Sequence, residues 1–152
     1  MKRSKRLQVI VDIKANQEQK ALETLGQSQR QHTQMKGQVE GLTIYRRDYV
    51  DKCNAFAREG VQVSRLIEFR SFIDKLDVAI VGQERVLQHM EHDVQAKRRM
   101  WETMHRGTQS IQKVRESALK IEQKQENKRE QSEMDEHASR LGRKKSINTS
   151  SV

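Results

Sequence analysis

The residues of this chain that could take part in metal chemistry are histidines. His89 and His92, in the segment HMEH, lie one helical turn apart, and with Glu91 or His105 they could in principle share an ion. Structural and catalytic metal sites usually draw on more ligands at defined spacings. We therefore interpret these histidines as solvent-facing side chains and expect no bound metal.

Catalytic and nucleotide-binding patterns are also absent from the sequence. The segment GQVEGL at 37–42 lacks both the lysine of a phosphate-binding loop and a preceding strand. Cys53 is the only cysteine, so we expect no internal disulfide and interpret it as a small packing residue in a reducing compartment. A pair of long helices offers no cleft that would exclude water from reacting groups. We predict that the protein is not an enzyme and uses no cofactor.

The net charge of +9 favours acidic partners such as nucleic acid or an anionic membrane surface. Basic residues cluster at 2–6, 97–99 and 143–145, but elsewhere they alternate with 21 acidic residues, as on solvated helix faces. The aromatic residues that would stack on bases lie away from two of these clusters. We therefore expect no nucleic acid partner, and a basic nucleic-acid-binding coiled coil stays as an alternative.

The elements that position these residues are predicted to be long helices. The chain has no proline, and 34% of its residues are charged. Two series of residues, spaced alternately by four and three, form heptad seams. The first series is Leu7, Val11, Lys14, Glu18, Ala21, Leu25, Ser28, His32, Met35, Val39, Leu42, Arg46, Tyr49, Cys53 and Phe56. The second is Leu66, Phe69, Ile73, Leu76, Ile80, Gln83, Leu87, Met90, Val94, Lys97, Trp101, Met104, Thr108 and Ile111.

These seams predict an all-α fold, a long two-helix antiparallel coiled-coil hairpin with an extended C-terminal helix. We expect helix 1 at about 5–58, a turn at about 59–63 and helix 2 at about 64–140, all in a single domain of residues 1–142. Gly60 is the expected breaker and Ser64 the expected N-cap of helix 2. The basic, serine-rich segment 143–152 is expected to be disordered.

A turn centred near residue 61 pairs residues whose numbers sum to about 122, which places Ala21 opposite Trp101. Helix 1 then ends opposite residue 115 or so, and roughly twenty-five residues of helix 2, about 35 Å, have no partner in the chain. Such a helix either frays or docks onto another molecule. The basic N-terminus is not read as a signal peptide because Asp12 and Lys14 interrupt its apolar run. With no apolar stretch long enough to span a bilayer, we expect a soluble, cytoplasmic protein.

Five of the six aromatic residues fall between positions 45 and 72. The segment EFRSFIDKLDVAI at 68–80 has more apolar residues than one seam uses, and Phe72 and Ala79 are left beside it. Tyr45 has the same offset from seam position Arg46. An apolar fringe with aromatic rings on a polar rod is typical of a binding hot spot. The alternatives are a locally broader coil, or a homodimer or crystal contact that uses the patch.

The sequence resembles the FliJ family, the small coiled-coil components of the flagellar type III export apparatus. The resemblance spans almost the whole chain and is carried by several segments in order. These are ALETLGQ with Gly26, QVEGLTIYRRDY at 38–49, the Gly60 turn before Ser64 and Arg65, SFIDKLDVAI, Trp101 followed by an acidic residue, and MDEHASR at 134–140.

The resemblance implies a stalk that inserts into the hexameric flagellar export ATPase, promotes its assembly and activity, and contacts both the cytoplasmic domain of the export gate membrane protein and flagellar export chaperones. It also implies peripheral association with the apparatus at the inner membrane. The implied gate-binding residues are Gln38, Leu42, Tyr45, Tyr49, Phe72, Leu76 and Ala79. The implied ATPase-binding residues at the open end of the hairpin are Arg3, Arg6, Leu7, Met134, Asp135, Glu136 and Arg140. The equivalent stalk protein of a virulence secretion system is the alternative within this class.

Overall fold

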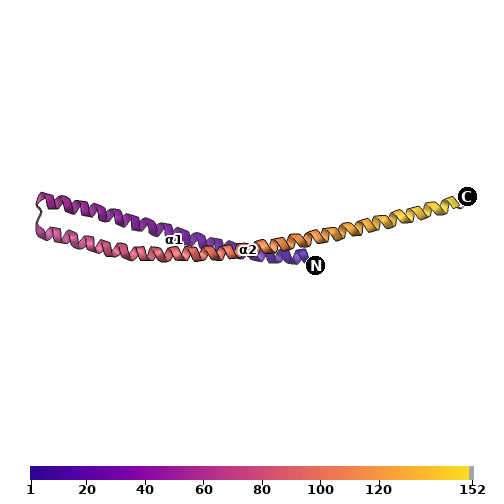
Figure 1. Cartoon of the computed structure of the whole chain (residues 1–152), viewed down its shortest axis with the longest axis horizontal. Helices are drawn as coiled ribbons and strands as arrows, with labels where there is room; N and C mark the ends of the chain where they lie inside the picture. The colour runs from indigo at the N-terminus through magenta and orange to yellow at the C-terminus, as the bar shows by residue number, and fades with distance from the viewer. Residues whose placement is uncertain (151–152) are drawn as a thin grey trace. The chain divides into compact units, whose positions relative to one another are not determined.

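The computed structural model describes residues 1–150, which form two helices, α1 (Arg3–Glu59) and α2 (Val63–Ser150) (Figure 1). No strand occurs in this part of the chain. The predicted all-α hairpin with an extended C-terminal helix is therefore confirmed. Contacts divide the chain into two units, which we name the hairpin unit (Gln17–His105) and the terminal unit, made of Met1–Asn16 and the part of α2 from Arg106 onward.

In the hairpin unit, the chain reverses at Gly60. Its φ of +79° lies in the left-handed region, which glycine enters without the steric cost of a Cβ. The N–H of Val61 donates to the carbonyl of Phe56, the backbone bond of a Schellman C-cap. Gly60 is thus the predicted breaker. The predicted N-cap is wrong, because α2 already begins at Val63, and the carbonyl of Gln62 rather than Ser64 accepts its first hydrogen bonds.

The two helices of the hairpin unit pack antiparallel in the predicted register. Cross-helix polar contacts join Arg46 to Asp77, Ser28 to Asp93 and Glu18 to His105, pairs whose numbers sum to 123, 121 and 123. Every predicted seam position from Glu18 to Phe56 and from Leu66 to Met104 is buried or half-buried. The period of 3.5 residues therefore identified the packed face correctly even where its residues are polar.

The packed face is thin in both units. Among the described residues, no large side chain is less than 2% exposed. In each unit the buried apolar side chains form a row rather than a globular core. In the hairpin unit they are Ala21, Leu25, Val39, Cys53, Leu76, Ile80 and Val94, and in the terminal unit they are Val11 and Ala118. A row open to solvent on both sides tolerates Arg, Lys and Gln at seam positions, because their polar ends reach water while their stems pack.

In the terminal unit, α1 packs along α2 as far as Glu122. Ser4 is buried and hydrogen-bonded to Glu122, and Leu7, Val11 and Lys14 continue the seam. Contact thus reaches about two turns beyond the predicted limit near residue 115. The start of α1 at Arg3 adds one seam position, Ser4, and its partner Glu122 lies about one turn further along α2 than the predicted register gives. From residue 127 to 149 every residue of α2 is exposed.

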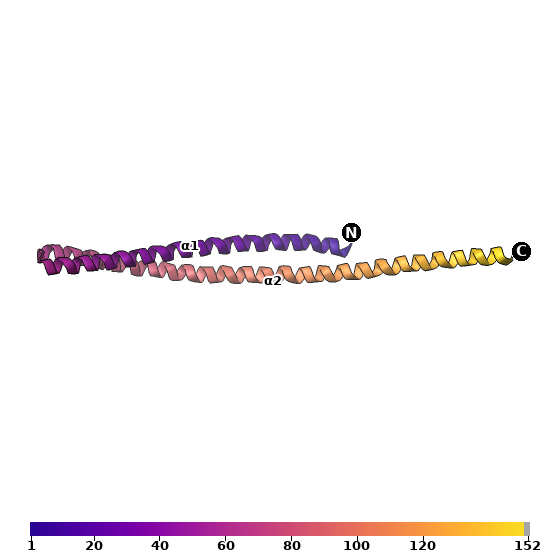
Figure 2. The ribbon, with the colours of Figure 1, turned by 90° about the horizontal axis from the view of Figure 1, so that it is seen from above.

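Helix α2 continues through residues 143–150, where we expected a disordered tail. The segment after Gly142 contains no helix breaker, and the hydroxyl of Thr149 donates to the carbonyls of Lys145 and Ser146. Residues 151 and 152 of that expected tail lie outside the described range. That residues 1–142 form one domain stays a prediction. Figure 2 shows the ribbon from a second direction, with the turn between α1 and α2 at one end.

We expect Gly60→Ala and Gly41→Ala to change stability in opposite directions. Neither position has an atom within 4 Å of a new Cβ, so only the backbone differs. Gly60→Ala forces alanine into the left-handed region and should cost about 1 kcal/mol. Gly41→Ala, in the middle of α1, should raise the free energy of unfolding by about 0.5–1 kcal/mol. Urea unfolding followed by far-UV circular dichroism measures both, and equal effects would contradict the assigned cap.

Candidate functional site

A cluster of five aromatic rings occupies the hairpin unit next to the turn. Tyr49 lies at its centre, 4.6 Å from Phe72, 5.4 Å from Tyr45 and 5.6 Å from Phe69 between ring centroids. Tyr45 and Phe72 meet edge to face at 6.3 Å, and Phe56 stacks on Phe69 at 5.3 Å. Rings at these separations stabilise one another beyond the area that they bury, so the cluster is a stiff platform.

The cluster has a packed side and a solvent side. Tyr49, Phe56 and Phe69 are half-buried in the seam, whereas Tyr45 is 47% exposed and Phe72 is 36% exposed. Each of these two rings precedes a seam residue by one position, and they contact each other across the two helices. Residues that directly precede a seam residue in this way, on α1 and on α2, therefore lie along the same edge of the hairpin.

Ala79 and Val86 share this offset and are exposed as well. We name Tyr45, Phe72, Ala79 and Val86 the tip edge. Val86 was missed in the sequence analysis, although its position directly before Leu87 gave the same signal. Rings and aliphatic side chains that are held in place but exposed can bind an apolar surface.

The structure places the residues implied for gate binding at three depths. Tyr45, Phe72, Ala79 and Gln38 are exposed, and Leu42 and Tyr49 are half-buried. Leu76 is only 7% exposed and lies in the seam, where it supports the surface from beneath. The predicted patch therefore consists of an exposed edge and the seam residues that carry it.

Basic side chains lie over the rings of this cluster. Lys52 Nζ is 6.0 Å from the centroid of Tyr49, and Arg65 Cζ is 5.9 Å from that of Phe56. Arg65, Glu68 and Phe72 also line a hollow of about 240 Å³ together with Tyr49 and Phe69. The hollow is small, so it suits one side chain of a partner rather than a cofactor.

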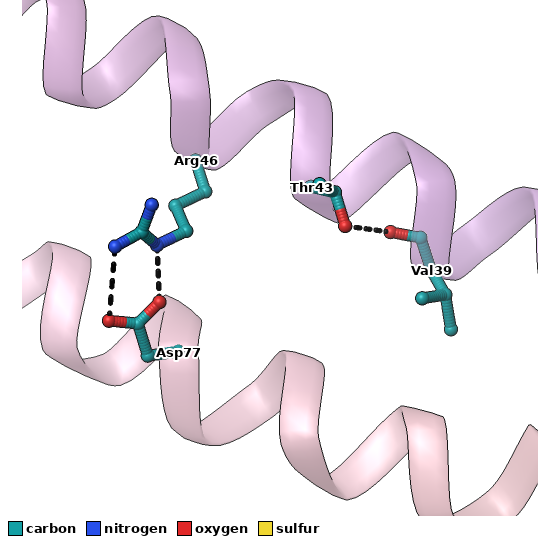
Figure 3. A network of polar contacts seen from close by, with 4 residues as sticks. All are labelled: Val39, Thr43, Arg46 and Asp77. Atoms are coloured by element: carbon teal, nitrogen blue, oxygen red, sulfur yellow. Dashed lines mark hydrogen bonds and ion pairs between the residues drawn. The ribbon is translucent and has the colours of Figure 1, made fainter.

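One polar contact between the helices lies beside the cluster. Figure 3 shows Arg46, a seam residue of α1, directing its guanidinium at the carboxylate of Asp77 on α2. Both side chains are well exposed, so the pair adds little stability, but a slip of one turn would separate them. The hydroxyl of Thr43 donates to the carbonyl of Val39 at 2.9 Å within α1 (Figure 3).

Of the three histidines considered for a metal, His89 and His92 are exposed and His105 is engaged in packing. The ring of His105 stacks on Trp101 at 5.2 Å, and its Nδ1 lies 2.5 Å from Glu18 Oε1. Within residues 1–150, no group of three or more His, Cys, Asp or Glu side chains is placed to hold a metal. Neither helix contains, in the same range, a stretch with the length and hydrophobicity of a bilayer-spanning segment.

In the terminal unit, a carboxylate of α2 caps the start of α1. The backbone N–H of Ser4 donates to Glu122 Oε1 at 3.0 Å, and the Ser4 hydroxyl donates to Oε2 at 2.6 Å. First-turn N–H groups have no partner within a helix, and α1 has no acidic residue of its own there. These two hydrogen bonds hold the pKa of Glu122 below its ordinary value of 4.5, and the bond from the Ser4 hydroxyl has the larger effect.

The residues implied for ATPase binding do not form one surface. Arg3 and Arg6 are exposed and Leu7 is half-buried, all on α1. Met134, Asp135, Glu136 and Arg140 are exposed on α2, beyond its packing with α1. A shallow hollow of about 480 Å³ beside Met134 is lined by α2 residues alone, among them Ala138 and Leu141. The two sets are therefore separate candidate contacts.

Comparison with known proteins identifies relatives for nearly the whole chain. Residues 3–146 match the family model described as "Flagellar FliJ protein". The flagellar FliJ protein of Escherichia coli (strain K12) is 25% identical over 139 residues, which cover 91% of this chain and 95% of that protein. The flagellar FliJ protein of Salmonella typhi is 24% identical over the same coverage. No solved structure matches the chain at a significant level.

We expect acid to loosen the start of α1 through Glu122. Its pKa is lowered by folding, so its contribution to stability is complete above the ordinary value of 4.5 and is lost as the pH falls through the lower folded value. The protection of amide hydrogens in the first turns of α1, relative to the intrinsic exchange rate at each pH, should therefore fall on acidification. Glu122→Gln should lower this protection already at neutral pH and remove its pH dependence, whereas Glu116→Gln, an exposed control, should do neither. Identical profiles for wild type and Glu122→Gln would contradict the cap.

Proposed function

The chain belongs to the family of flagellar FliJ proteins, and from this premise we propose that it is the stalk that links the export ATPase to the export gate. Family membership makes it a component of the flagellar protein export apparatus. The finer role has three parts: insertion into the hexameric ATPase ring, promotion of ring assembly and activity, and contact with the cytoplasmic domain of the gate membrane protein. Export chaperones are further proposed partners.

The tip edge is the observation that carries the proposal. Tyr45 and Phe72 are held by Tyr49 in a rigid ring cluster, yet both remain exposed. An interface gains most from aromatic side chains that need little ordering when they bind. We assign the gate contact to Tyr45, Phe72 and Ala79 with Gln38 at its margin, and we give Leu42, Tyr49 and Leu76 the task of supporting them.

The terminal unit supports the proposed ATPase contact. From residue 127 to residue 149, every residue of α2 is exposed to solvent. Among them are the large apolar side chains of Met134 and Leu141, which are 72% and 51% exposed. An isolated helix with apolar side chains gains stability when it docks into a partner. The proposed ATPase residues on this segment are Met134, Asp135, Glu136 and Arg140, and those on α1 are Arg3, Arg6 and Leu7.

In this mechanism the protein performs no bond-making step. A stalk that contacts successive ring subunits with different affinity favours particular states of the ring, and by reciprocity those states change its own contacts. Gate contact at one unit and ATPase contact at the other would then couple nucleotide turnover to export. The relatives bear flagellar names, which favours this system over a virulence secretion system.

We expect Tyr45→Ala and Phe72→Ala to weaken binding to the purified cytoplasmic domain of the gate protein. Each should cost about 1–2 kcal/mol in a titration, since both remove an exposed ring of a hot spot, and each should reduce swimming motility. Helicity should change little. Val78→Ala is the matched control, because Val78 is exposed on α2 outside the tip edge.

The variant Ile73→Asp distinguishes a loss of gate binding at the surface from a loss of packing in the seam. A carboxylate in the packed row should destabilise the hairpin itself and lower its helicity. The gate assignment fails if Tyr45→Ala and Phe72→Ala unfold the chain as Ile73→Asp does, or if they bind as tightly as Val78→Ala.

We expect the purified chain to raise the turnover and oligomerisation of the export ATPase. Met134→Glu combined with Leu141→Glu should reduce both effects, because the apolar face of the unpaired α2 segment becomes charged. Ile67→Glu combined with Val78→Glu makes the same change on exposed residues of the hairpin unit and should leave stimulation intact. No stimulation by the unmodified chain would refute the stalk role.

A further inference from the structure

The net charge of the chain is concentrated in the terminal unit. This unit has 16 Lys and Arg residues against 8 Asp and Glu residues, a net charge of +8. The hairpin unit has 14 against 13, a net charge of +1, and the two account for the total of +9. A partner of the terminal unit therefore meets a strongly basic surface, whereas one of the hairpin unit does not.

Within the terminal unit, one edge of the helix pair carries apolar side chains. Ile10 directly precedes the seam residue Val11, and Val114 and Ile121 directly precede Arg115 and Glu122. The same offset places Tyr45 and Phe72 on one edge of the hairpin unit. In the terminal unit, Arg3 precedes Ser4 and lines the same hollow as Ile121, which shows that the offset again brings α1 and α2 to one edge.

These apolar side chains are exposed along the edge. Ile10, Val114 and Ile121 are 41%, 41% and 53% exposed, and Ile13, one turn after Ile10, is 53% exposed. They come from both helices, and Ile121 lines a hollow together with Arg3 of α1.

Cations of both helices border these apolar residues. Arg3 and Arg6 lie on the α1 side, and Lys120 and Lys124 line a hollow with Ile121 on the α2 side. Two carboxylates, Glu122 and Glu126, line the same hollow as Arg3 and Ile121, but both are engaged: Glu122 caps Ser4, and Glu126 pairs with Arg129 at 2.8 Å. Asp12 and Glu116 each follow a seam residue and so lie on the other side of the seam.

We propose that this edge, which we name the basic edge, binds an acidic amphipathic helix of a partner as a third strand of the coiled coil. Ile10, Ile13, Val114 and Ile121 supply the apolar floor, and the rows of Arg and Lys pair with carboxylates that flank the apolar stripe of the incoming helix. An apolar strip bordered by cations of both helices matches the apolar stripe and flanking carboxylates of an acidic amphipathic helix. The inference deepens the proposed stalk function, on which it rests for the partner's place in the export apparatus.

The test uses a labelled peptide of about 21 residues, three heptads, with Leu at the a and d positions and Glu and Ala elsewhere. Fluorescence anisotropy with the full-length chain should show saturable binding that weakens as salt rises. Lys120→Glu with Lys124→Glu should weaken binding by about tenfold or more. Val114→Ser with Ile121→Ser should also weaken it severalfold, with less dependence on salt. All four positions are exposed, so helicity should be retained.

Lys75→Glu with Arg85→Glu is the matched control, because it makes the same charge change on exposed residues of the hairpin unit and should leave binding unaltered. A scrambled peptide of identical composition should bind weakly. The basic edge is refuted if the scrambled peptide binds equally well, if the serine variants bind normally, or if only anionic lipid vesicles or duplex DNA bind at these lysines. Absent peptide binding with normal ATPase stimulation would overturn the basic edge alone, whereas absent stimulation with normal peptide binding would overturn the stalk role alone.

Discussion

Everything in this molecule depends on a single row of interlocking side chains between two helices. The row is one residue deep, and none of its large side chains is fully shielded from water. Packing at a constant distance between helix axes requires small residues opposite large ones, and Ala21, opposite Trp101 in this register, makes room for the largest side chain of the seam. A row of this kind uses most apolar residues of the chain, so any further apolar side chain has to lie at an edge. Both candidate surfaces are such edges.

Polar contacts divide this row into stretches of known register. Arg46 with Asp77, Ser28 with Asp93 and Ser4 with Glu122 each require the two helices to be in step at one place. Such pairs add little stability at an exposed seam, but they make slipped registers unfavourable because a slip leaves charges and donors without partners. The chain reversal at Gly60 determines which residues of α2 lie opposite those of α1 next to the turn, and so sets the register of the nearest pairs.

The sequence was sufficient for the packed face, the turn and the register, because a heptad pattern sustained over about seven heptads leaves little freedom in pairing. Features that depend on where a helix starts or stops were not predictable in the same way. The capping of Ser4 by Glu122 required knowing that α1 begins at Arg3, and Ser64 lost its expected role when α2 began one residue earlier. The tip edge followed from sequence offsets, whereas the burial of Leu76 beneath it came from packing. The basic edge needed the division of charge between the two units.

The thinness of the packed row also determines how the protein can open. Because the chain has no globular core, each heptad contributes to stability mainly through its own contacts, and fraying at one terminus leaves distant heptads intact. The first heptads of α1 are held against α2 by the contact between Ser4 and Glu122 and by a few aliphatic side chains. Loss of that contact would therefore separate α1 from α2 turn by turn from the N-terminus of α1, while the hairpin unit stays folded.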